Sequence, residues 1–369
     1  MSAAAGPLSG LRIVSLAEQY PGPYATLLMA DLGAEVILVE RPGAGDPARQ
    51  FPAFHEALNR NKRAVAIDLK SDAGRDALRA LLRCADVMLE GFRPGTMARL
   101  GFGYEDVSAL NPRLVYVSIS GFGQDGPYRD RPAHDLSYQA IAGLLFAQAR
   151  SGTAAPAGDL AIGDLSSAMF AVVGALAALQ QRGRSGRGSH VDVSMTDGLV
   201  SWMSVMLGPT MNGEPLADIG AEPAYGTFRC GDGRLLTLSI AHEDWFWRPL
   251  CALLDMDDAA GFGRAERVAD EARLRARIAA ALERAPRAVW AERLDAAGIA
   301  WGPLNDLDEV AADPHFIARG LFREVPDGRG GMRRCVAQPL VFDGSHPGPV
   351  RGTPAPGEGN AELLGTKET

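Results

Sequence analysis

Short apolar runs alternate with helically spaced apolar residues along the first part of the chain, and this alternation restricts its fold more than any other feature. Residues 11–16 indicate a buried strand, and residues 24–32 repeat apolar side chains at helical spacing before Gly33, a common helix stop. Residues 35–40 form the next apolar run. A strand, a helix and a strand within about thirty residues predict a βαβ unit, and hence a parallel sheet with a right-handed crossover.

The alternation continues and predicts an α/β fold with a large Rossmann-like parallel sheet. Apolar runs predict further strands at residues 64–69, 86–90, 114–119 and 189–193, and helices at 72–83 and from 195. No GxGxxG fingerprint follows the first strand, where the turn has Glu18, Gln19, Tyr20 and Pro21 instead. An NAD-dependent dehydrogenase is therefore disfavoured, and we expect no NAD.

A second, smaller α+β domain is expected after a linker. Residues 210–223 are rich in Gly and Pro and lose periodicity, which is typical of a linker. Two apolar runs then flank Asp232 and Gly233, a pair that predicts a hairpin turn, and helical spacing follows. The predicted organisation is a large α/β domain over 1–209, a small α+β domain over 224–324, and a tail, 325–369, that returns to the large domain.

Composition excludes several classes of protein. A net charge of -8 disfavours non-specific binding to nucleic acid. Four cysteines without CxxC pairs argue against a disulfide framework and a zinc site, so we expect no metal and a cytoplasmic protein. No signal-like segment opens the chain, and the apolar stretch 168–179 is too short to span a bilayer. We therefore expect no membrane association.

Asp164 is the main candidate for chemistry. It follows Gly163 at the start of a long helix of small residues that runs to about residue 179, which is a position typical of an N-cap. Backbone N–H groups there would hold its carboxylate ionised. For an isolated Asp, the alternative is a purely structural helix cap.

Basic residues crowd the first hundred positions, as a polyanionic ligand would require. Arg41 and Arg93 each follow a predicted strand, where open α/β sheets bind ligands, and Lys62 and Arg63 precede another strand. Solvated surface charge is the alternative, and we expect it to explain Arg49 and Lys70. For Lys62, the alternative is a plain exposed lysine.

Several motifs along the chain, in order, resemble those of the family III CoA-transferases, which include formyl-CoA and carnitine-CoA transferases and the α-methylacyl-CoA racemases. The matching motifs occupy residues 21–23, 31–36, 39–43, 59–63, 90–95, 121–128, 133–140, 160–168 and 197–198. The resemblance implies coenzyme A, carried as an acyl-CoA substrate, and an interlocked homodimer whose active site lies between the large domain of one subunit and the small domain of the other. It also implies that Arg41 and Arg93, then Lys62 and Arg63, contact the CoA nucleotide.

The resemblance leaves two reactions open. In the transferases, the carboxylate matching Asp164 attacks the acyl-CoA thioester to form a mixed anhydride, and CoA passes to a carboxylic acid acceptor. In the racemases, a His at the position of His134 and the later Asp exchange the α-proton on opposite faces of the substrate. Asp135 is then expected to anchor its loop. A third possibility is a non-catalytic acyl-CoA-binding protein.

Other residues divide between these reactions, and we favour CoA transfer because it needs only Asp164 and the family is broad in that direction. Tyr138, Gln139 and the residues after Asp164 look more like the transferases. However, the transferases usually carry a Gly-rich loop where this chain has residues 239–245, which contain no glycine. The racemases place a supporting Glu near here, and in this chain His242 falls on that position with Glu243 beside it.

Overall fold

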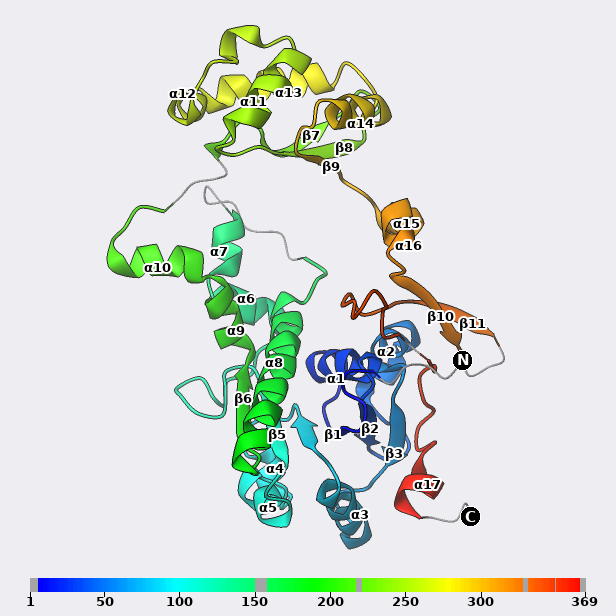
Figure 1. The fold of residues 1–369 in the computed structure, drawn as a ribbon. Helices are drawn as coiled ribbons and strands as arrows, with labels where there is room; N and C mark the ends of the chain where they lie inside the picture. The colour runs from blue at the N-terminus through cyan, green and yellow to red at the C-terminus, as the bar shows by residue number, and fades with distance from the viewer. Residues whose placement is uncertain (1–5, 150–157, 217–220, 328–330, 349, 366–369) are drawn as a thin grey trace. The chain divides into compact units, whose positions relative to one another are not determined.

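The structure, a computed structural model, describes residues 6–149, 158–216, 221–327, 331–348 and 350–365, and it divides into two compact units (Figure 1). The first unit comprises Met1–Leu207 and His315–Thr369, and the second comprises Gly208–Pro314. The return to the first unit therefore begins at residue 315, before the expected 325. A boundary at residue 325 would fall inside β10 (Phe322–Pro326). β10 pairs with β11 (Met332–Val336), and this pairing keeps the two strands in one unit.

A six-stranded parallel sheet forms the centre of the first unit. Its order, β3-β2-β1-β4-β5-β6, changes direction between β1 and β4, as in doubly wound α/β proteins. This confirms the expected α/β class and Rossmann-like sheet. The strands are β1 (Arg12–Ser15), β2 (Glu35–Glu40), β3 (Arg63–Ala66), β4 (Val87–Glu90), β5 (Val115–Ser120) and β6 (His190–Ser194).

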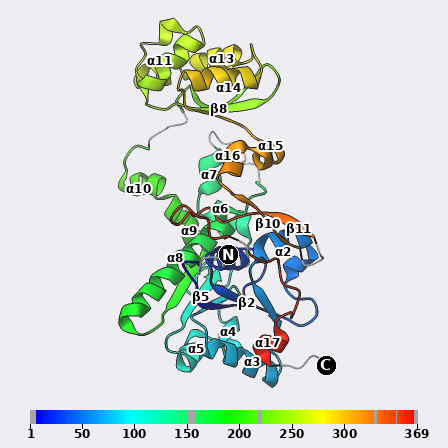
Figure 2. The same cartoon turned by 45° about the vertical axis from the view of Figure 1, so that its right-hand side comes forward.

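Helices cover both faces of this sheet (Figures 1 and 2). Side chains of successive strand residues point to opposite faces, so Ile13 joins one apolar core and Val14 the other. The Ile13 core contains residues of α1 (Pro21–Asp31) and α8 (Ile162–Ser185). The Val14 core contains residues of α3 (Asp72–Arg83), α4 (Thr96–Arg99) and α5 (Tyr104–Leu110).

Helix α1 begins at Pro21, three residues before the periodicity indicated. Residues Pro21 to Pro23 read as a turn in the sequence, but they form the first helical turn, where a missing proline N–H leaves no hydrogen bond unmade. Gly22 is needed there because a Cβ would lie 2.1 Å from the Cβ of Ala17. The loop after β1 is therefore pressed closely against the start of α1.

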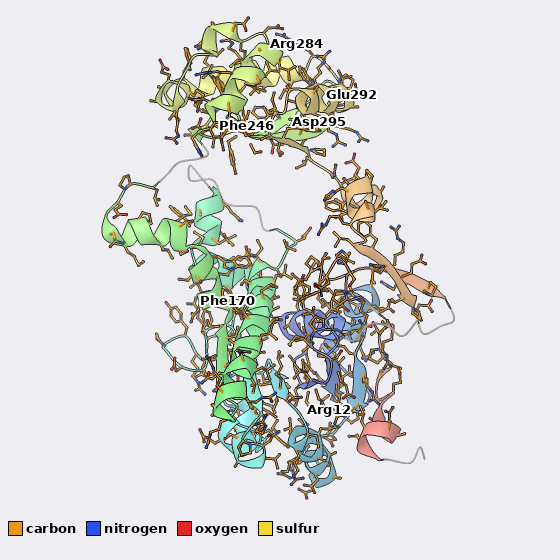
Figure 3. All side chains as sticks on the ribbon, viewed as in Figure 1. Arg12, Phe170, Phe246, Arg284, Glu292 and Asp295 are labelled. Atoms are coloured by element: carbon orange, nitrogen blue, oxygen red, sulfur yellow. The ribbon has the colours of Figure 1, made fainter. Side chains whose placement is uncertain are left out.

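Helix α8 has 24 residues and is longer than the apolar stretch suggested. By length and apolar composition alone it could span a membrane, so the expectation that no run reaches that length is wrong. Its small buried residues, among them Ala168, Ala171 and Ala175, pack on the sheet as in the central helix of a globular domain. Phe170 of the same helix, labelled in Figure 3, closely approaches Gly198, where a Cβ would lie 3.0 Å from Phe170 Cδ2.

The second unit has its own sheet and core. The predicted hairpin is present as β7 (Tyr225–Arg229) and β8 (Leu235–Ser239), and β9 (Trp301–Pro303) adds a third antiparallel strand that the sequence did not indicate. Trp247, Cys230 and Cys251 are buried in its apolar core. Its helices are α11 (Asp244–Leu253), α12 (Arg264–Ala269), α13 (Glu271–Leu282), α14 (Arg287–Ala296), α15 (Leu307–Ala312) and the short η3 (Asp257–Ala259).

The C-terminal tail makes backbone contacts with the first unit. Asn61 Oδ1 accepts the backbone N–H of Val350 and of Arg351, and the Gly359 N–H donates to the carbonyl of Ala64 at 2.8 Å.

The other helices of the described residues are η1 (Pro47–Gln50), α2 (Pro52–Asn59), α6 (Asp135–Ile141), α7 (Leu144–Ala149), α9 (Met195–Trp202), α10 (Ser204–Asn212), α16 (Pro314–Ala318) and α17 (Asn360–Leu364).

Candidate active site

The candidate site lies at the carboxyl edge of the parallel sheet, beside the change of strand direction between β1 and β4. The loop after β1 carries Glu18 and Tyr20, and the loop after β4 carries Arg93. Open α/β sheets bind ligands in the crevice at this point, because the loops diverge there. The first turn of α8, with Asp164, belongs to the same neighbourhood, since its charge acts on Tyr20.

Asp164 stands in the first turn of α8, but it does not cap the helix. The N-cap is Ala161, and the backbone N–H of Asp164 donates to Asp135 Oδ1 at 3.0 Å. Asp135 thus supplies the carboxylate that satisfies this helix N-terminus. Gly163 makes the contact possible, because a Cβ on that residue would lie 2.8 Å from Asp135 Oδ1.

The Asp164 carboxyl is half-buried and resists ionisation. Burial raises its pKa to about 7, and the negative charge of Asp135 adds to the rise. The expectation that helix N–H groups hold Asp164 ionised is therefore wrong, since its own N–H is given to Asp135. The site holds a carboxyl that changes charge near neutral pH, as many catalytic carboxyls do.

Two tyrosines and an arginine complete this charged neighbourhood. Burial raises the pKa of the Tyr138 hydroxyl, the charge of Asp164 raises it further, and Arg93 lowers it. The Tyr138 hydroxyl donates to the Ala133 carbonyl at 2.9 Å. Burial and the charge of Asp164 also raise the pKa of Tyr20, which packs edge-on against Phe54. Tyr20 was not singled out from the sequence, where it appeared only as part of a turn.

His134 is exposed and is the N-cap residue of α6, although its side chain makes no capping hydrogen bond. It immediately precedes Asp135, whose Oδ2 accepts a hydrogen bond from Gln139 while Oδ1 binds the Asp164 N–H. Asp135 anchors its loop, as the sequence suggested. His134 is therefore one residue away from the group that contacts Asp164.

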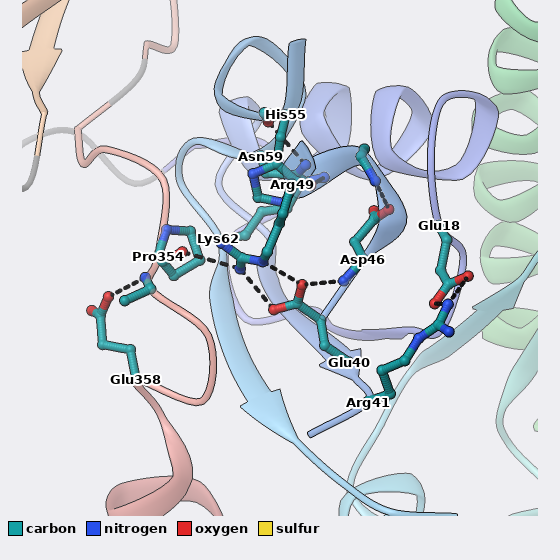
Figure 4. A network of polar contacts seen from close by, with 12 residues as sticks. Glu18, Glu40, Arg41, Asp46, Arg49, His55, Asn59, Lys62, Pro354 and Glu358 are labelled. Atoms are coloured by element: carbon teal, nitrogen blue, oxygen red, sulfur yellow. Dashed lines mark hydrogen bonds and ion pairs between the residues drawn. The ribbon is translucent and has the colours of Figure 1, made fainter. Parts of the chain in front are cut away.

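Arg41 follows β2 and lies at the same carboxyl edge of the sheet. Its Nη2 is 3.0 Å from Glu18 Oε1, in an exposed ion pair drawn in Figure 4. Burial raises the pKa of Glu18, and the ion pair with Arg41 opposes that rise. Exposed ion pairs contribute little free energy, so an incoming phosphate can compete with Glu18 for this arginine.

Arg93 is exposed and has no ion-pair partner in the described part of the chain. Two arginines that the sequence analysis missed lie close to its loop. At Gly95, a Cβ would lie 3.4 Å from Arg99 Nη1 and 3.2 Å from Arg129 Nη2. The signal was available for Arg99, which is six residues beyond Arg93, whereas Arg129 approaches only through the folded loop after β5.

Arg63 lies at the amino ends of the parallel strands, whereas this site lies at their carboxyl ends. It begins β3, and it pairs with Glu35, the first residue of β2, at 3.0 Å and with Glu362 of the tail at 2.5 Å. These residues lie at the amino edge of the sheet, as does Arg12, labelled in Figure 3. The structure does not bring Arg63 together with Arg41 and Arg93.

Lys62 is wholly buried, so it is neither an exposed lysine nor a free cation at the site. Its Nζ donates to Pro23 O at 2.8 Å and to Thr26 Oγ1 at 2.8 Å. It also donates to Asn59 Oδ1 at 2.9 Å, and Lys62 and Asn59 are both labelled in Figure 4. Burial lowers its pKa well below the usual range. Three acceptors occupy the three donors of an ammonium group, and none remains for a phosphate.

The other two residues discussed from the sequence, His242 and Glu243, lie in the second unit. Glu243 precedes α11, and its Oε2 accepts the Ala241 N–H at 2.8 Å. His242 stands edge-on to Trp245, which is exposed. Among the residues that the structure describes, no three His, Cys, Asp or Glu side chains are grouped to hold a metal ion.

A protein-family model described as CoA-transferase family III matches residues 8–360, nearly the whole chain. The chain belongs to CoA-transferase family III. It is 34% identical over 333 residues, covering 86% of this chain and 85% of the relative, to an acetyl-CoA:oxalate CoA-transferase of Acetobacter aceti. A succinate–glutarate CoA-transferase of Agrobacterium fabrum is 31% identical, with 98% of this chain and 96% of the relative covered. Family III membership and these relatives make the chain a transferase that uses CoA thioesters.

Solved structures of the family agree with the fold. A CAIB/BAIF family protein from Brucella suis aligns with a TM-score of 0.87 at 29% identity, covering 98% of this chain and 99% of that one. A hypothetical protein from Mycobacterium tuberculosis aligns with a TM-score of 0.88 at 29% identity, covering 98% and 100%. The expected family III fold is therefore confirmed for this chain.

Proposed function

We propose that this chain moves CoA from an acyl-CoA thioester to a carboxylic acid through an anhydride on Asp164. The supporting observation is the Asp164 carboxyl itself, half-buried at the carboxyl edge of the sheet with a pKa of about 7. A carboxylate whose conjugate acid has a raised pKa is more basic, and a desolvated carboxylate attacks a thioester more readily. Near neutral pH, a large share of it is still ionised.

In the proposed reaction, an Asp164 oxygen attacks the thioester carbonyl, the C–S bond breaks, and CoA leaves as its thiolate. The carboxylate of the acceptor then attacks the Asp164 carbonyl carbon and expels the donor acid, which leaves the acceptor joined to Asp164. The CoA thiolate attacks the acceptor carbonyl and releases Asp164 as a carboxylate. No proton is gained or lost over the cycle, so the site requires only one well-placed carboxylate and protection from water.

Four arginines that follow β2, β4 and β5 in the chain are the proposed ligands of the CoA phosphates. Arg93 and Arg129 lie on the loops after β4 and β5, Arg99 ends the short helix α4, and Arg41 follows β2. The guanidinium group matches phosphate oxygens with two parallel hydrogen bonds, which makes it well suited to a pyrophosphate. Lys62 and Arg63 have internal partners, and we leave them out of the proposed site.

We propose short dicarboxylic acids as the acyl and acceptor groups. The relatives reported above are named for oxalate and for succinate and glutarate. The resemblance to family III also leads us to propose an interlocked homodimer, which sedimentation analysis of the purified chain tests.

Racemisation of 2-methylacyl-CoA is the second candidate, because His134 is exposed one residue from the Asp135 contact to Asp164. A single experiment separates the two reactions. A (2R)-2-methylacyl-CoA and, separately, succinyl-CoA are incubated in deuterated water, without and then with a free dicarboxylic acid. The proposal requires a new thioester that forms only with the acid. Deuterium at the α-carbon with no acid present would instead establish the racemase, and CoA binding without either product would indicate a binding protein.

A further inference from the structure

Glu90, the last residue of β4, is a buried carboxylate without a cation. It is 4% exposed, and in the described part of the chain no lysine or arginine pairs with it. Its Oε2 accepts the backbone N–H of Phe92 at 2.8 Å, which fixes the peptide group between Gly91 and Phe92, one peptide before the one that leads to Arg93. An unpaired buried charge costs free energy, so stability alone gives no reason for a carboxyl at this position.

A row of polar side chains continues from Glu90 across the sheet. In the strand register Glu90 lies beside Ser118 of β5, and Ser118 lies beside Asp192 of β6. The Ser118 hydroxyl hydrogen-bonds the Glu90 carboxylate, and its Oγ is 3.0 Å from His190 Nε2. Asp192 Oδ2 accepts the Gln124 N–H at 2.8 Å, at the start of the loop after β5.

The two carboxylates of this row therefore hold the two loops that carry Arg93 and Arg129, two of the proposed phosphate ligands. Glu90 holds the loop after β4, which bears Arg93 and leads to Arg99. Asp192 holds the loop after β5, which bears Arg129. Loops that carry binding residues need such supports, because a displacement of about 1 Å in a ligand-binding group weakens its contacts markedly.

We propose that Glu90 is a positioning residue that sets the affinity for the acyl-CoA by holding the Arg93 loop in its binding geometry. This inference rests on the proposed function, because it takes the arginines as the CoA-binding groups. Ser118 of β5 hydrogen-bonds Glu90, and Tyr116 of β5 and Asp192 of β6 are close enough to interact with its charge. His190 of β6 reaches the row through Ser118, and while it is uncharged none of these groups carries a positive charge that would neutralise an ionised Glu90.

The support is sensitive to pH near neutrality. Burial raises the pKa of Glu90 to about 7; the Phe92 N–H and Ser118 oppose the rise, and the charge of Asp192 adds to it. Above this pH the ionised carboxylate accepts a stronger hydrogen bond from Phe92 than the protonated acid does below it. Affinity for the CoA nucleotide therefore falls as the pH drops through about 7. Burial lowers the pKa of His190, so its protonation belongs to a more acidic range.

Glu90→Gln tests the inference, because glutamine keeps the shape and an oxygen acceptor for Phe92 but cannot ionise. The affinity for CoA itself is measured by calorimetry, at pH values on both sides of neutrality, for the wild-type chain and the variant. We expect the variant to bind CoA roughly tenfold more weakly than wild type on the alkaline side, and equally on the acidic side. In turnover, KM for the acyl-CoA rises by a similar factor, and kcat changes much less.

Two controls make the result specific. Glu292→Gln removes an exposed carboxylate of α14, which belongs to the second unit and not to the polar row, and should leave both the affinity and its pH dependence unchanged. Dephospho-CoA replaces CoA in a repeat series, so that titration of the ligand's 3′-phosphate is not mistaken for titration of Glu90. The thermal midpoint of each variant reports any general loss of structure.

The outcomes separate this inference from the proposed function. If wild type binds CoA and Glu90→Gln shows the same affinity and the same pH dependence, the inference is wrong and the proposed function stands. If Glu90→Gln loses kcat and thermal stability with no change in CoA affinity, its role is structural and the inference is again wrong. If wild type does not bind CoA at all, the proposed function itself fails.

Discussion

The carboxylate of Asp135 accepts the backbone N–H of Asp164 at 3.0 Å, so two acidic residues from separate helices meet at one helix N-terminus. This contact explains two properties of the site. It supplies the helix end with an anion other than Asp164, and it places a negative charge beside Asp164, which adds to the effect of burial in raising its pKa to about 7.

Asp135→Asn removes that charge and keeps an oxygen that can accept the Asp164 N–H. If catalysis needs ionised Asp164, kcat/KM of the wild type falls as the pH drops through about 7, because below that pH Asp164 becomes protonated. In the variant the pKa of Asp164 falls, so the acid limb moves to lower pH. A pH–rate profile of both chains tests this, and an acid limb unchanged by the substitution would contradict it.

Arg93→Ala removes a proposed phosphate ligand that has no ion-pair partner in the described residues. We expect KM for the acyl-CoA to rise about tenfold or more, as the loss of charge-assisted hydrogen bonds predicts. Arg63→Ala is the matched control, because Arg63 pairs with Glu35 and Glu362 at the opposite edge of the sheet. Steady-state kinetics that gave equal effects for the two variants would argue against the proposed site.

Lys62→Met leaves the Pro23 carbonyl, the Thr26 hydroxyl and the Asn59 side-chain oxygen without their shared donor. Unpaired buried acceptors are costly, so the free energy of unfolding should drop by about 2–4 kcal/mol. Lys70→Met, at an exposed position, is the control and should change it by less than about 0.5 kcal/mol. Denaturant unfolding measures both. A stable Lys62→Met chain with a raised KM for acyl-CoA would restore Lys62 as a CoA ligand.

His134→Ala should leave CoA transfer between acids largely intact, because the side chain is exposed and the proposed cycle needs no second acid/base group. The measurement is the rate of new thioester formation, compared with the wild type and with Leu136→Ala, an exposed neighbour on the same helix. A loss approaching a thousandfold in His134→Ala alone would assign the histidine a part in the chemistry and favour proton exchange.

Much of the fold could be predicted because its strands are buried on both faces. Such strands appear in sequence as continuous apolar runs, so β2 lies where the pattern indicated. β8 is buried only at alternate residues, and the Asp232–Gly233 turn before it marked its place. The short strand β9 has only three residues and gives no such signal. The start of α1 was misplaced because Pro21 to Pro23 suit a turn as well as a first helical turn.

The site was only partly predictable, since its decisive contacts join residues distant in sequence. The motif around Asp164 was visible, but Asp135 lies 29 residues earlier, and its contact with the Asp164 N–H arises only on folding. Similarly, nothing near Lys62 in the sequence shows that Pro23 and Thr26 will surround its amine. Arg63 was adjacent to a strand, but at the end that points away from the ligand crevice.

The central claim is that Asp164 becomes covalently acylated, and trapping that species tests it most directly. The chain is incubated with succinyl-CoA and hydroxylamine, without an acceptor acid, and its peptides are analysed by mass spectrometry. Our account predicts a hydroxamate on the peptide containing Asp164, no such product in Asp164→Asn, and normal labelling in Asp159→Asn, an exposed neighbouring position. Asp164→Asn should also lose at least about a thousandfold in kcat. A chain that turns over acyl-CoA while its Asp164 peptide stays unmodified would contradict the account.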